Sequence, residues 1–237
     1  MFKAQVVILA GGQGSRLRPY TTVLPKPLLP VGGKPILEIL IRQLRHFGFK
    51  NIVISTGYLA ELIEAYFGKG EKWGVHICYV HEDKPLGTAG ALKLVEDTER
   101  NFLVMNGDIL TDMNFATFLN WHTRQKAMAS LTVKERKIKS DFGVIEFGPD
   151  HELRAYQEKP EHQSFVSIGV NAFNSRAKNF IKPGESVGMP ELMLRLKALS
   201  HRVCCYPVRQ EWLDLGRFED LERAQDIFVH TKKKSHL

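Results

Sequence analysis

The chain has 237 residues, of which 43% are hydrophobic and 25% charged, so it is long enough to bury a full core and has the composition of an ordinary globular protein. No apolar run approaches the ~20 residues of a membrane-spanning helix, and the apolar stretch at 6–10 is too short for a signal peptide, so we expect a cytoplasmic protein. The net charge is +7, but three lysines lie at 232–234 and the other basic residues are dispersed among acids, which argues against nucleic acid and favours small polyanionic substrates. Three cysteines, at 78, 204 and 205, have neither an even count nor metal-ligand spacing, which argues against a disulfide framework.

Strand-like and helix-like segments alternate in the first half of the chain. Apolar runs of strand length lie at 5–10, 51–56, 75–80 and 101–105. Segments with helical spacing lie at 36–47, at 59–67 and from residue 88. Such alternation implies parallel strands joined by right-handed crossovers, with ligands bound beyond the carboxyl ends of the strands. We therefore expect a binding site in the loops at 11–35, 81–90 and 106–112.

The second half is richer in short β-like runs, which lie at 129–133, 143–147, 153–158, 165–173 and 203–208. Helices are expected at 115–125, 190–199 and 218–228. We therefore predict an α/β fold with a mixed, mainly parallel sheet flanked by helices, in which the later strands build a lid or acceptor pocket over the first half. No linker or internal repeat is evident, so residues 1–229 are expected to form a single domain, followed by a flexible basic tail at 230–237.

The loop that opens the chain is both glycine-rich and basic. Gly11, Gly12 and Gly14 let the backbone turn sharply and bring amide N–H groups close to a ligand, and Arg16 and Lys26 add positive charge. A glycine cluster alone would also fit a flexible surface turn. Together with the basic residues, it predicts a phosphate-binding loop.

Two carboxylates are candidates for a magnesium site. Asp108 directly follows the strand at 101–105, and Asp214 lies between apolar neighbours near the C-terminus. Mg²⁺ typically takes one or two carboxylates together with substrate phosphates. The alternatives are a simple Asn-Gly-Asp turn at 106–108 and a helix N-cap role for Asp214.

Other candidates are distributed over later loops. Lys159 offers a cation for a second phosphate, and Glu158 offers an acceptor for sugar hydroxyls, although an exposed turn explains both. Gly143 and Gly169 would allow close approach of the backbone to a sugar ring, or mark β-bulges.

The loop at 81–90 is the candidate for base recognition. The carboxylate of Glu82 suits guanine, which presents two adjacent donors, although it can also accept from cytosine or be a solvated charge. Gly87 would let a flat base lie against the backbone.

Seven segments resemble, in order, the motifs of the sugar-1-phosphate nucleotidyltransferases, also called NDP-sugar pyrophosphorylases. They are LAGGQGSRLRPYTTVLPKPLLPVGGKP, HEDKPLGTAGAL, NGD, DFGV, EKP, VSIGV and WLDLGR. The resemblance extends to about Phe228, and PLGTAGAL together with NGD looks most like the short bacterial branch that makes GDP-mannose, GDP-heptose and related GDP-hexoses. Two positions depart from common forms: Ser15 replaces a frequent threonine, and Ser167 stands where many relatives carry asparagine, which leaves the sugar open.

This resemblance implies a Rossmann-like fold of the nucleotide-diphospho-sugar transferase type, with a nucleotide-binding half at 1–112 and a sugar-binding half at 113–229. It implies catalytic roles for Arg16, Lys26 and Lys159, and a Mg²⁺ cofactor held by Asp108 and Asp214. The implied nucleotide contacts are Leu9, Gly11, Gly12, Gly14, Glu82, Gly87 and Thr88. The implied sugar contacts are Asn106, Gly143, Glu158, Ser167 and Gly169.

The implied reaction transfers a nucleoside monophosphate from an NTP, with GTP favoured, to a sugar 1-phosphate and releases pyrophosphate. UTP, CTP or dTTP are alternative donors, a choline phosphate is an alternative acceptor, and a non-catalytic nucleotide-sugar-binding regulator is an alternative function. A Rossmann dehydrogenase is disfavoured because the opening glycines do not match GxGxxG. We expect no nucleic-acid or membrane partner, and a homo-oligomer is left open.

Overall fold

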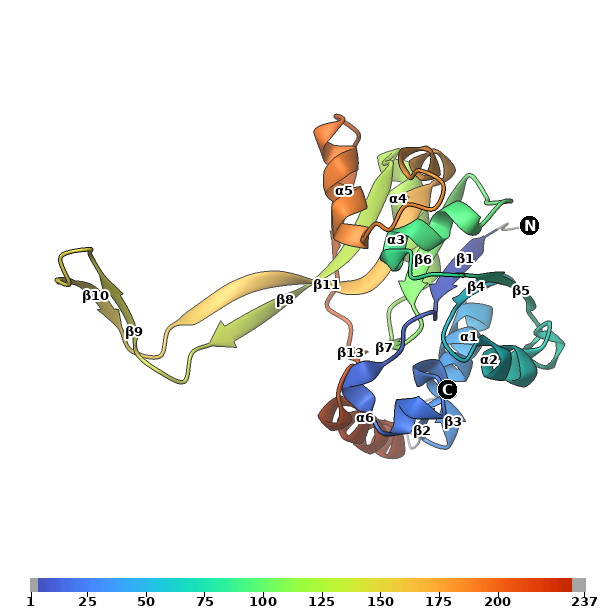
Figure 1. The fold of residues 1–237 in the computed structure, drawn as a ribbon, viewed down its shortest axis with the longest axis horizontal. Helices are drawn as coiled ribbons and strands as arrows, with labels where there is room; N and C mark the ends of the chain where they lie inside the picture. Colours follow the sequence, from blue (N-terminus) through green and yellow to red (C-terminus); the bar gives the residue numbers. More distant parts are fainter. Residues whose placement is uncertain (1–3, 232–237) are drawn as a thin grey trace.

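The computed structural model describes residues 4–231, with side chains described as far as residue 227, and its centre is a seven-stranded sheet (Figure 1). The strand order is β12-β8-β11-β6-β1-β4-β5. The bounds are β1 Gln5–Leu9, β4 Asn51–Thr56, β5 His76–His81, β6 Asn101–Asn106, β8 Ala129–Lys139, β11 Glu161–Asn174 and β12 Val203–Pro207. Within this sheet β11 is antiparallel to both of its neighbours, and the other adjacent strands pair in parallel. The mixed, mainly parallel sheet predicted from the sequence is confirmed.

Helices cover both faces of this sheet, because its central strands are apolar on both sides. Val6 and Ile8 of β1 belong to a core formed with α1 (Ile36–His46), α2 (Ala60–Phe67) and α4 (Phe115–Gln125). Val7, between them, belongs to a second core formed with α3 (Gly87–Gly90) and α5 (Met189–Ala198) on the other face. Side chains alternate between the faces of a strand, so a continuous apolar run such as 6–8 serves two cores at once.

A third, smaller core lies beneath the opening loop. Leu17, Leu29 and Ile36 pack there with Leu215 and with Ala224 of the C-terminal helix α6 (Phe218–Thr231). The hairpin of β2 (Pro30–Val31) and β3 (Lys34–Pro35) is tied to α6 by two hydrogen bonds of the Gln225 amide, which accepts from Gly32 N at 2.8 Å and donates to Pro30 O at 2.9 Å. Helix α6 therefore fixes the position of the hairpin and of the opening loop that precedes it.

The structure differs from the expected lid over the first half. Strands β8 and β11 continue beyond the sheet as a two-stranded ribbon that ends in the hairpin of β9 (Val144–Phe147) and β10 (Leu153–Gln157), and this ribbon points away from the body (Figure 1). We call residues 134–167 the arm. Its two strands pair row by row from Ser167 opposite Val133 to Glu161 opposite Lys139, so a regular ladder carries it outward. Residues 134–139 are mostly charged, so they lack the alternation of apolar residues from which a strand is expected.

Two helical expectations need adjustment. The helix expected from residue 88 is a single turn, α3, followed by a 3-10 turn at Ala91–Leu94. The amides of Ala89 and Gly90, which have no acceptor within a first helical turn, donate to Val187 O and anchor this turn to the segment before α5. Helix α6 runs to Thr231 rather than 228, and the rest of the expected tail, 232–237, lies outside the described residues. No helix between residues 4 and 231 combines the length and the apolar composition that crossing a bilayer requires.

Candidate functional site

Two cavities in the described part of the chain have comparable volumes, about 540 and 630 Å³. The larger opens at the carboxyl ends of β1, β4 and β6. Its walls come from four loops, at 9–16, 57–58, 82–88 and 106–108, and from Lys26 and Pro27. All three loops expected from the sequence contribute. Ligands in open α/β sheets bind at this edge, so this cavity is the candidate functional site.

The glycines of the opening loop differ in backbone conformation and in the space around them. Gly14 has φ +61°, and a Cβ there would lie 3.0 Å from Thr21 Cγ2 and 3.2 Å from Lys26 Cβ. At Gly12 a Cβ would meet nothing within 4 Å, so that position is open. The amides of Gly12, Gln13 and Gly14 donate to no acceptor in the described range 4–231. Free amides on a cavity wall beside basic residues form a suitable surface for an anion.

Lys26 lies within this anion surface and is itself buried, with 7% of its surface exposed. Its ammonium group forms an ion pair with Asp108 Oδ2. The other carboxylate oxygen, Oδ1, is buried and has no hydrogen-bond partner among the described residues. A buried acceptor without a donor is costly unless something binds it. Asp108 therefore presents a free oxygen ligand beside the anion surface.

Asp214 lies next to Asp108, although it does not line the cavity itself. Strand β13 (Trp212–Asp214) pairs with β7 (Ile109–Thr111) so that Asp214 is opposite Ile109, and Leu215 N donates to Asp108 O at 3.1 Å. Burial and then the Asp108 carboxylate raise the pKa of Asp214, while the charges of Lys26 and Arg16 oppose that rise. The two carboxylates and two cations thus form one electrostatic cluster.

The alternative role of Asp214 as a helix N-cap is wrong. Asp214 is the last residue of a strand, and α6 begins four residues later. The amide of Arg217, just before that helix, donates instead to Asp220 Oδ2 at 3.0 Å.

Arg16 extends from the opening loop toward the C-terminal segment. A Cβ on Gly216 would lie 3.2 Å from both of its terminal guanidinium nitrogens, so glycine there leaves room for the arginine. Arg16 is exposed, and its guanidinium therefore stands at the border between the cavity and solvent, near Asp214.

The candidates for base recognition shape the loop that follows β5. Glu82 is half-buried and accepts hydrogen bonds from Ser55 Oγ at 2.8 Å and from Leu86 N at 3.1 Å, so it is not a solvated charge. Gly87 has φ +72°, and a Cβ there would lie 2.6 Å from Val187 O. The hydroxyl of Thr88 accepts from Met189 N at 2.7 Å. All three line the cavity, as does Leu9 at the end of β1.

The candidates for sugar contact fall into two groups. Asn106 lines the cavity, and its amide nitrogen lies 2.8 Å from where a Cβ on Gly169 would be. Gly169 has φ +79° and sits in the bulge between Ser167 and Asn171, which directs that part of β11 toward Asn106. Ser167 is exposed at the base of the arm, two residues away.

The second group lies together on the arm. A Cβ on Gly143 would lie 2.6 Å from Tyr156 Oη and 3.1 Å from Glu158 Oε2, and Tyr156 Oη donates to the same Glu158 oxygen at 3.1 Å. Lys159 is exposed and has φ +45°, a conformation that non-glycine residues rarely adopt. No residue of the arm lines the cavity. Within the described chain, the structure therefore does not bring Gly143, Glu158 or Lys159 to the opening loop.

Comparison with known proteins identifies the family of the chain. The family model described as "Nucleotidyl transferase" matches residues 5–230, which is nearly the whole chain. The chain belongs to the nucleotidyl transferase family.

Named relatives of this nucleotidyl transferase differ in their substrates. A UTP–glucose-1-phosphate uridylyltransferase of Synechocystis is 31% identical over 93% of the chain, and a D-glycero-alpha-D-manno-heptose 1-phosphate guanylyltransferase of Aneurinibacillus thermoaerophilus is 31% identical over 95%. The chain spans 62% of the length of the first relative and 99% of the second. A Bacillus anthracis structure solved with sucrose, assigned as a glucose-1-phosphate thymidylyltransferase, has a TM-score of 0.78 and 26% identity, with 95% of each chain covered.

One wall of the cavity was not expected from the sequence. Tyr58 lines it from the loop that follows β4, together with Gly57. The rule that ligands bind beyond the carboxyl ends of parallel strands applies to this loop as well, so it could have been included. Lys84, from the loop after β5, also lines the cavity and adds a further cation to it.

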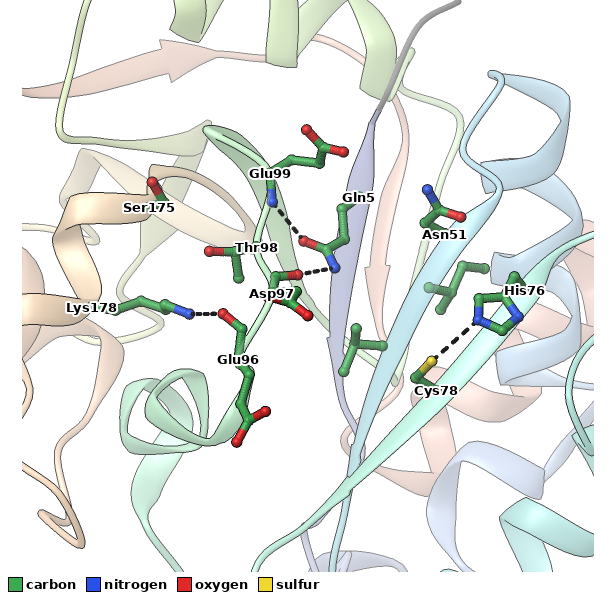
Figure 2. Close-up of a pocket in the computed structure, with 12 residues that line it drawn as sticks. Gln5, Asn51, His76, Cys78, Glu96, Asp97, Thr98, Glu99, Ser175 and Lys178 are labelled. Atoms are coloured by element: carbon green, nitrogen blue, oxygen red, sulfur yellow. Dashed lines mark hydrogen bonds between the residues drawn. The ribbon is translucent and has the colours of Figure 1, made fainter.

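The second cavity, of about 540 Å³, lies at the opposite edge of the sheet of this nucleotidyl transferase (Figure 2). It is lined by residues at the amino ends of strands, including Gln5, Asn51 and His76. Gln5 is committed to the protein itself, because its amide donates to Asp97 O at 2.9 Å and accepts from Glu99 N at 3.0 Å. Among the described residues, the free amides of 12–14 and the unpartnered oxygen of Asp108 lie at the other cavity, at the carboxyl edge, which is therefore the candidate site.

Proposed function

We propose that this nucleotidyl transferase moves a nucleoside monophosphate from a nucleoside triphosphate to a sugar 1-phosphate and releases pyrophosphate. The observation that carries the proposal is that the free amides of 12–14, Lys26 and the unpartnered oxygen of Asp108 face one cavity. The two 31% identical relatives, both named for this class of reaction, support it.

The residues present fit a Mg²⁺ ion. Asp108 offers a buried oxygen without a donor, and the neighbouring Asp214 offers a second carboxylate. Mg²⁺ prefers one or two carboxylates and substrate phosphates to an all-protein cage, so a cluster of three protein ligands is not needed. When bound, the ion would neutralise phosphate charge and help to orient the two substrates.

The remaining chemistry is mainly positioning, because a phosphate monoester is already an anion and needs no general base. Its oxygen would attack the α-phosphorus in line with the departing pyrophosphate. The amides of 12–14 would bind the triphosphate, while Lys26 and Arg16 would stabilise charge that develops on the leaving group. Lys159 would hold the phosphate of the sugar, with Gly143, Glu158, Ser167, Asn106 and Gly169 as contacts for the sugar itself.

GTP is the donor that we favour, because a carboxylate at position 82 can accept from adjacent donors on guanine. Each carboxylate oxygen has more than one lone pair, so the bonds from Ser55 and Leu86 leave Glu82 able to accept others. Leu9, Gly87 and Thr88 complete the expected nucleotide contacts. UTP is the alternative donor, because one relative is named a UTP–glucose-1-phosphate uridylyltransferase.

A screen for pyrophosphate release tests the proposal. Five nucleoside triphosphates would be paired with hexose, hexosamine and heptose 1-phosphates in the presence of Mg²⁺. We expect release with at least one pair, and only when the sugar phosphate is present. Release without any acceptor, or with none of the pairs, would overturn the proposal.

The metal has a separate test that needs no turnover. Mg²⁺ should raise the melting temperature of the wild type in the presence of the preferred nucleotide, and this rise should be lost in Asp214→Asn. An equal rise in both proteins would remove Asp214 from the metal site.

A further inference from the structure

The arm concentrates exposed apolar side chains. Sixteen large apolar residues are exposed in the described part of the chain, and half of them lie between 138 and 165. Phe142 is the most exposed of these, at 79%. The full set on the arm is Ile138, Phe142, Val144, Ile145, Phe147, Leu153, Tyr156 and Phe165. Exposed large apolar residues that gather on one segment, unlike single scattered ones, indicate an interaction site.

The arm also receives little support from its own chain. Its contacts with the body lie at its base, where Lys134 Nζ donates to Gln210 O and the Arg136 guanidinium stands 5.5 Å from the Trp212 ring. Further out, the polar contacts that the described chain makes stay within the arm, such as the ion pair of Lys137 with Glu161 at 3.1 Å. A two-stranded ribbon on its own in water is only marginally stable, so a covering surface would stabilise the outer part of the arm.

A second group of exposed apolar side chains lies beside the candidate active site. Tyr20, Val23 and Phe218 are exposed, Val23 at 75%, and the rings of Tyr20 and Phe218 have centroids 5.4 Å apart. Tyr20 and Val23 follow Arg16 on the opening loop, and Phe218 follows Gly216, which the Arg16 guanidinium covers. We call Tyr20, Val23 and Phe218 the rim patch. A segment that docks on it would lie next to the anion surface.

We propose that the arm of one copy of this chain docks on the rim patch of a second copy and brings its Lys159 and Glu158 to that copy's active site. The inference rests on the proposed function, which assigns the sugar phosphate to Lys159, a residue that does not line the cavity of its own copy. A second copy is the occupant that the geometry favours, because the ladder of β8 and β11 directs the arm away from its own body (Figure 1). With twofold symmetry each copy gives one arm and receives one, so both sites are completed.

Mixed dimers test this exchange. A dimer would be purified in which a Lys26→Ala copy and a Lys159→Ala copy carry different tags. The Lys26→Ala copy has an altered cavity and an intact arm, and the Lys159→Ala copy has an intact cavity and an altered arm. In such a dimer the sound arm meets the sound cavity at one of the two sites. We expect each variant alone to be at least a hundredfold less active, and the mixed dimer to regain about half of the wild-type activity.

The matched control is a mixed dimer of Lys26→Ala with Arg16→Ala. Both changes damage the cavity and spare the arm, so no site is sound and no activity should return. If the Lys26→Ala and Lys159→Ala dimer stays inactive while the wild type is active, or if Lys159→Ala alone is active, the exchange is refuted.

Light scattering provides a readout that does not depend on the reaction. The wild type should have twice the mass of one chain, and Phe142→Ser with Phe147→Ser should be a folded monomer by circular dichroism. Leu199→Ser, which changes an exposed apolar residue off the arm, should stay dimeric. A monomeric wild type, or a dimer that keeps its mass without the two phenylalanines, would overturn the proposal. An inactive but arm-dependent dimer would instead refute the proposed function alone.

Discussion

Lys26 is the single charge on which the proposed chemistry depends most. It is buried, it pairs with Asp108, and it lies on the cavity wall. Lys26→Ala should lower kcat about a hundredfold, which corresponds to about 3 kcal/mol of transition-state stabilisation. Steady-state kinetics would measure this, with Lys50→Ala as a control that removes an exposed lysine at the other edge of the sheet. Equal losses in the two variants would point to a general charge effect.

Gly14 allows a separate test of the loop's backbone. Gly14→Ala should cost about 1–2 kcal/mol for the left-handed conformation, and further free energy for the close contacts with Thr21 and Lys26. Gly33→Ala is the matched control, because Gly33 has φ +78° and open space around it, so it should cost only the conformational part. Urea denaturation would give both values. A Gly14 variant no less stable than the Gly33 variant would contradict the tight packing.

At the scale of elements, α6 stabilises the opening loop through hydrogen bonds and apolar contacts. Gln225 bonds to both Pro30 and Gly32, so Gln225→Ala leaves two backbone groups to find other partners. The free energy of unfolding should fall by about 1–3 kcal/mol, as measured by denaturant titration. Gln157→Ala, on the exposed strand β10, should change it little. A similar loss in both would show that the link between α6 and the loop is unimportant.

Elements with a strong apolar pattern could be predicted from the sequence. Elements stabilised by strand pairing or by hydrogen bonds to distant residues could not. The continuous run at 6–8 signals a strand buried on both faces, and β1 was found where it was expected. The outer part of β8 is charged and stabilised by pairing with β11, which leaves no periodic signal. Similarly, the turn at Ala89 and Gly90 depends on Val187, which is almost a hundred residues away.

At the scale of the whole molecule, acid stability should depend on one buried histidine. His122 connects α4 to the sheet through Nδ1, which lies 2.8 Å from Ser130 Oγ, and burial lowers its pKa to about 4. The unfolded chain binds a proton near pH 6.5, whereas the folded protein does so only near pH 4. The associated stability is therefore complete above pH 6.5, and about 3 kcal/mol of it is lost as the pH falls to 4.

The measurement is the pH dependence of unfolding in His122→Gln, compared with that of His151→Gln, which changes an exposed histidine. The loss between pH 6.5 and 4 should be smaller in the first variant and unchanged in the second. Parallel curves for wild type and His122→Gln would refute the assignment.

The arrangement of the whole site could be inferred from the sequence only in part. The order of strands and helices places the opening loop and Asp108 at one edge, because both follow parallel neighbouring strands. The approach of Asp214 depends on the short pairing of β13 with β7, which has no pattern of its own. The direction of the arm depends on a ladder that leaves the sheet, so the distance of Lys159 from the cavity could not be foreseen.

The central claim is a direct transfer between two phosphates, and phosphorus NMR of one reaction tests it most directly. With the preferred nucleoside triphosphate, its sugar 1-phosphate and Mg²⁺, we expect a new diphosphate diester and free pyrophosphate to form in equal amounts while both substrates disappear. Nucleoside monophosphate or diphosphate without the diester would contradict the account, because it would mean that water, rather than a sugar phosphate, is the acceptor.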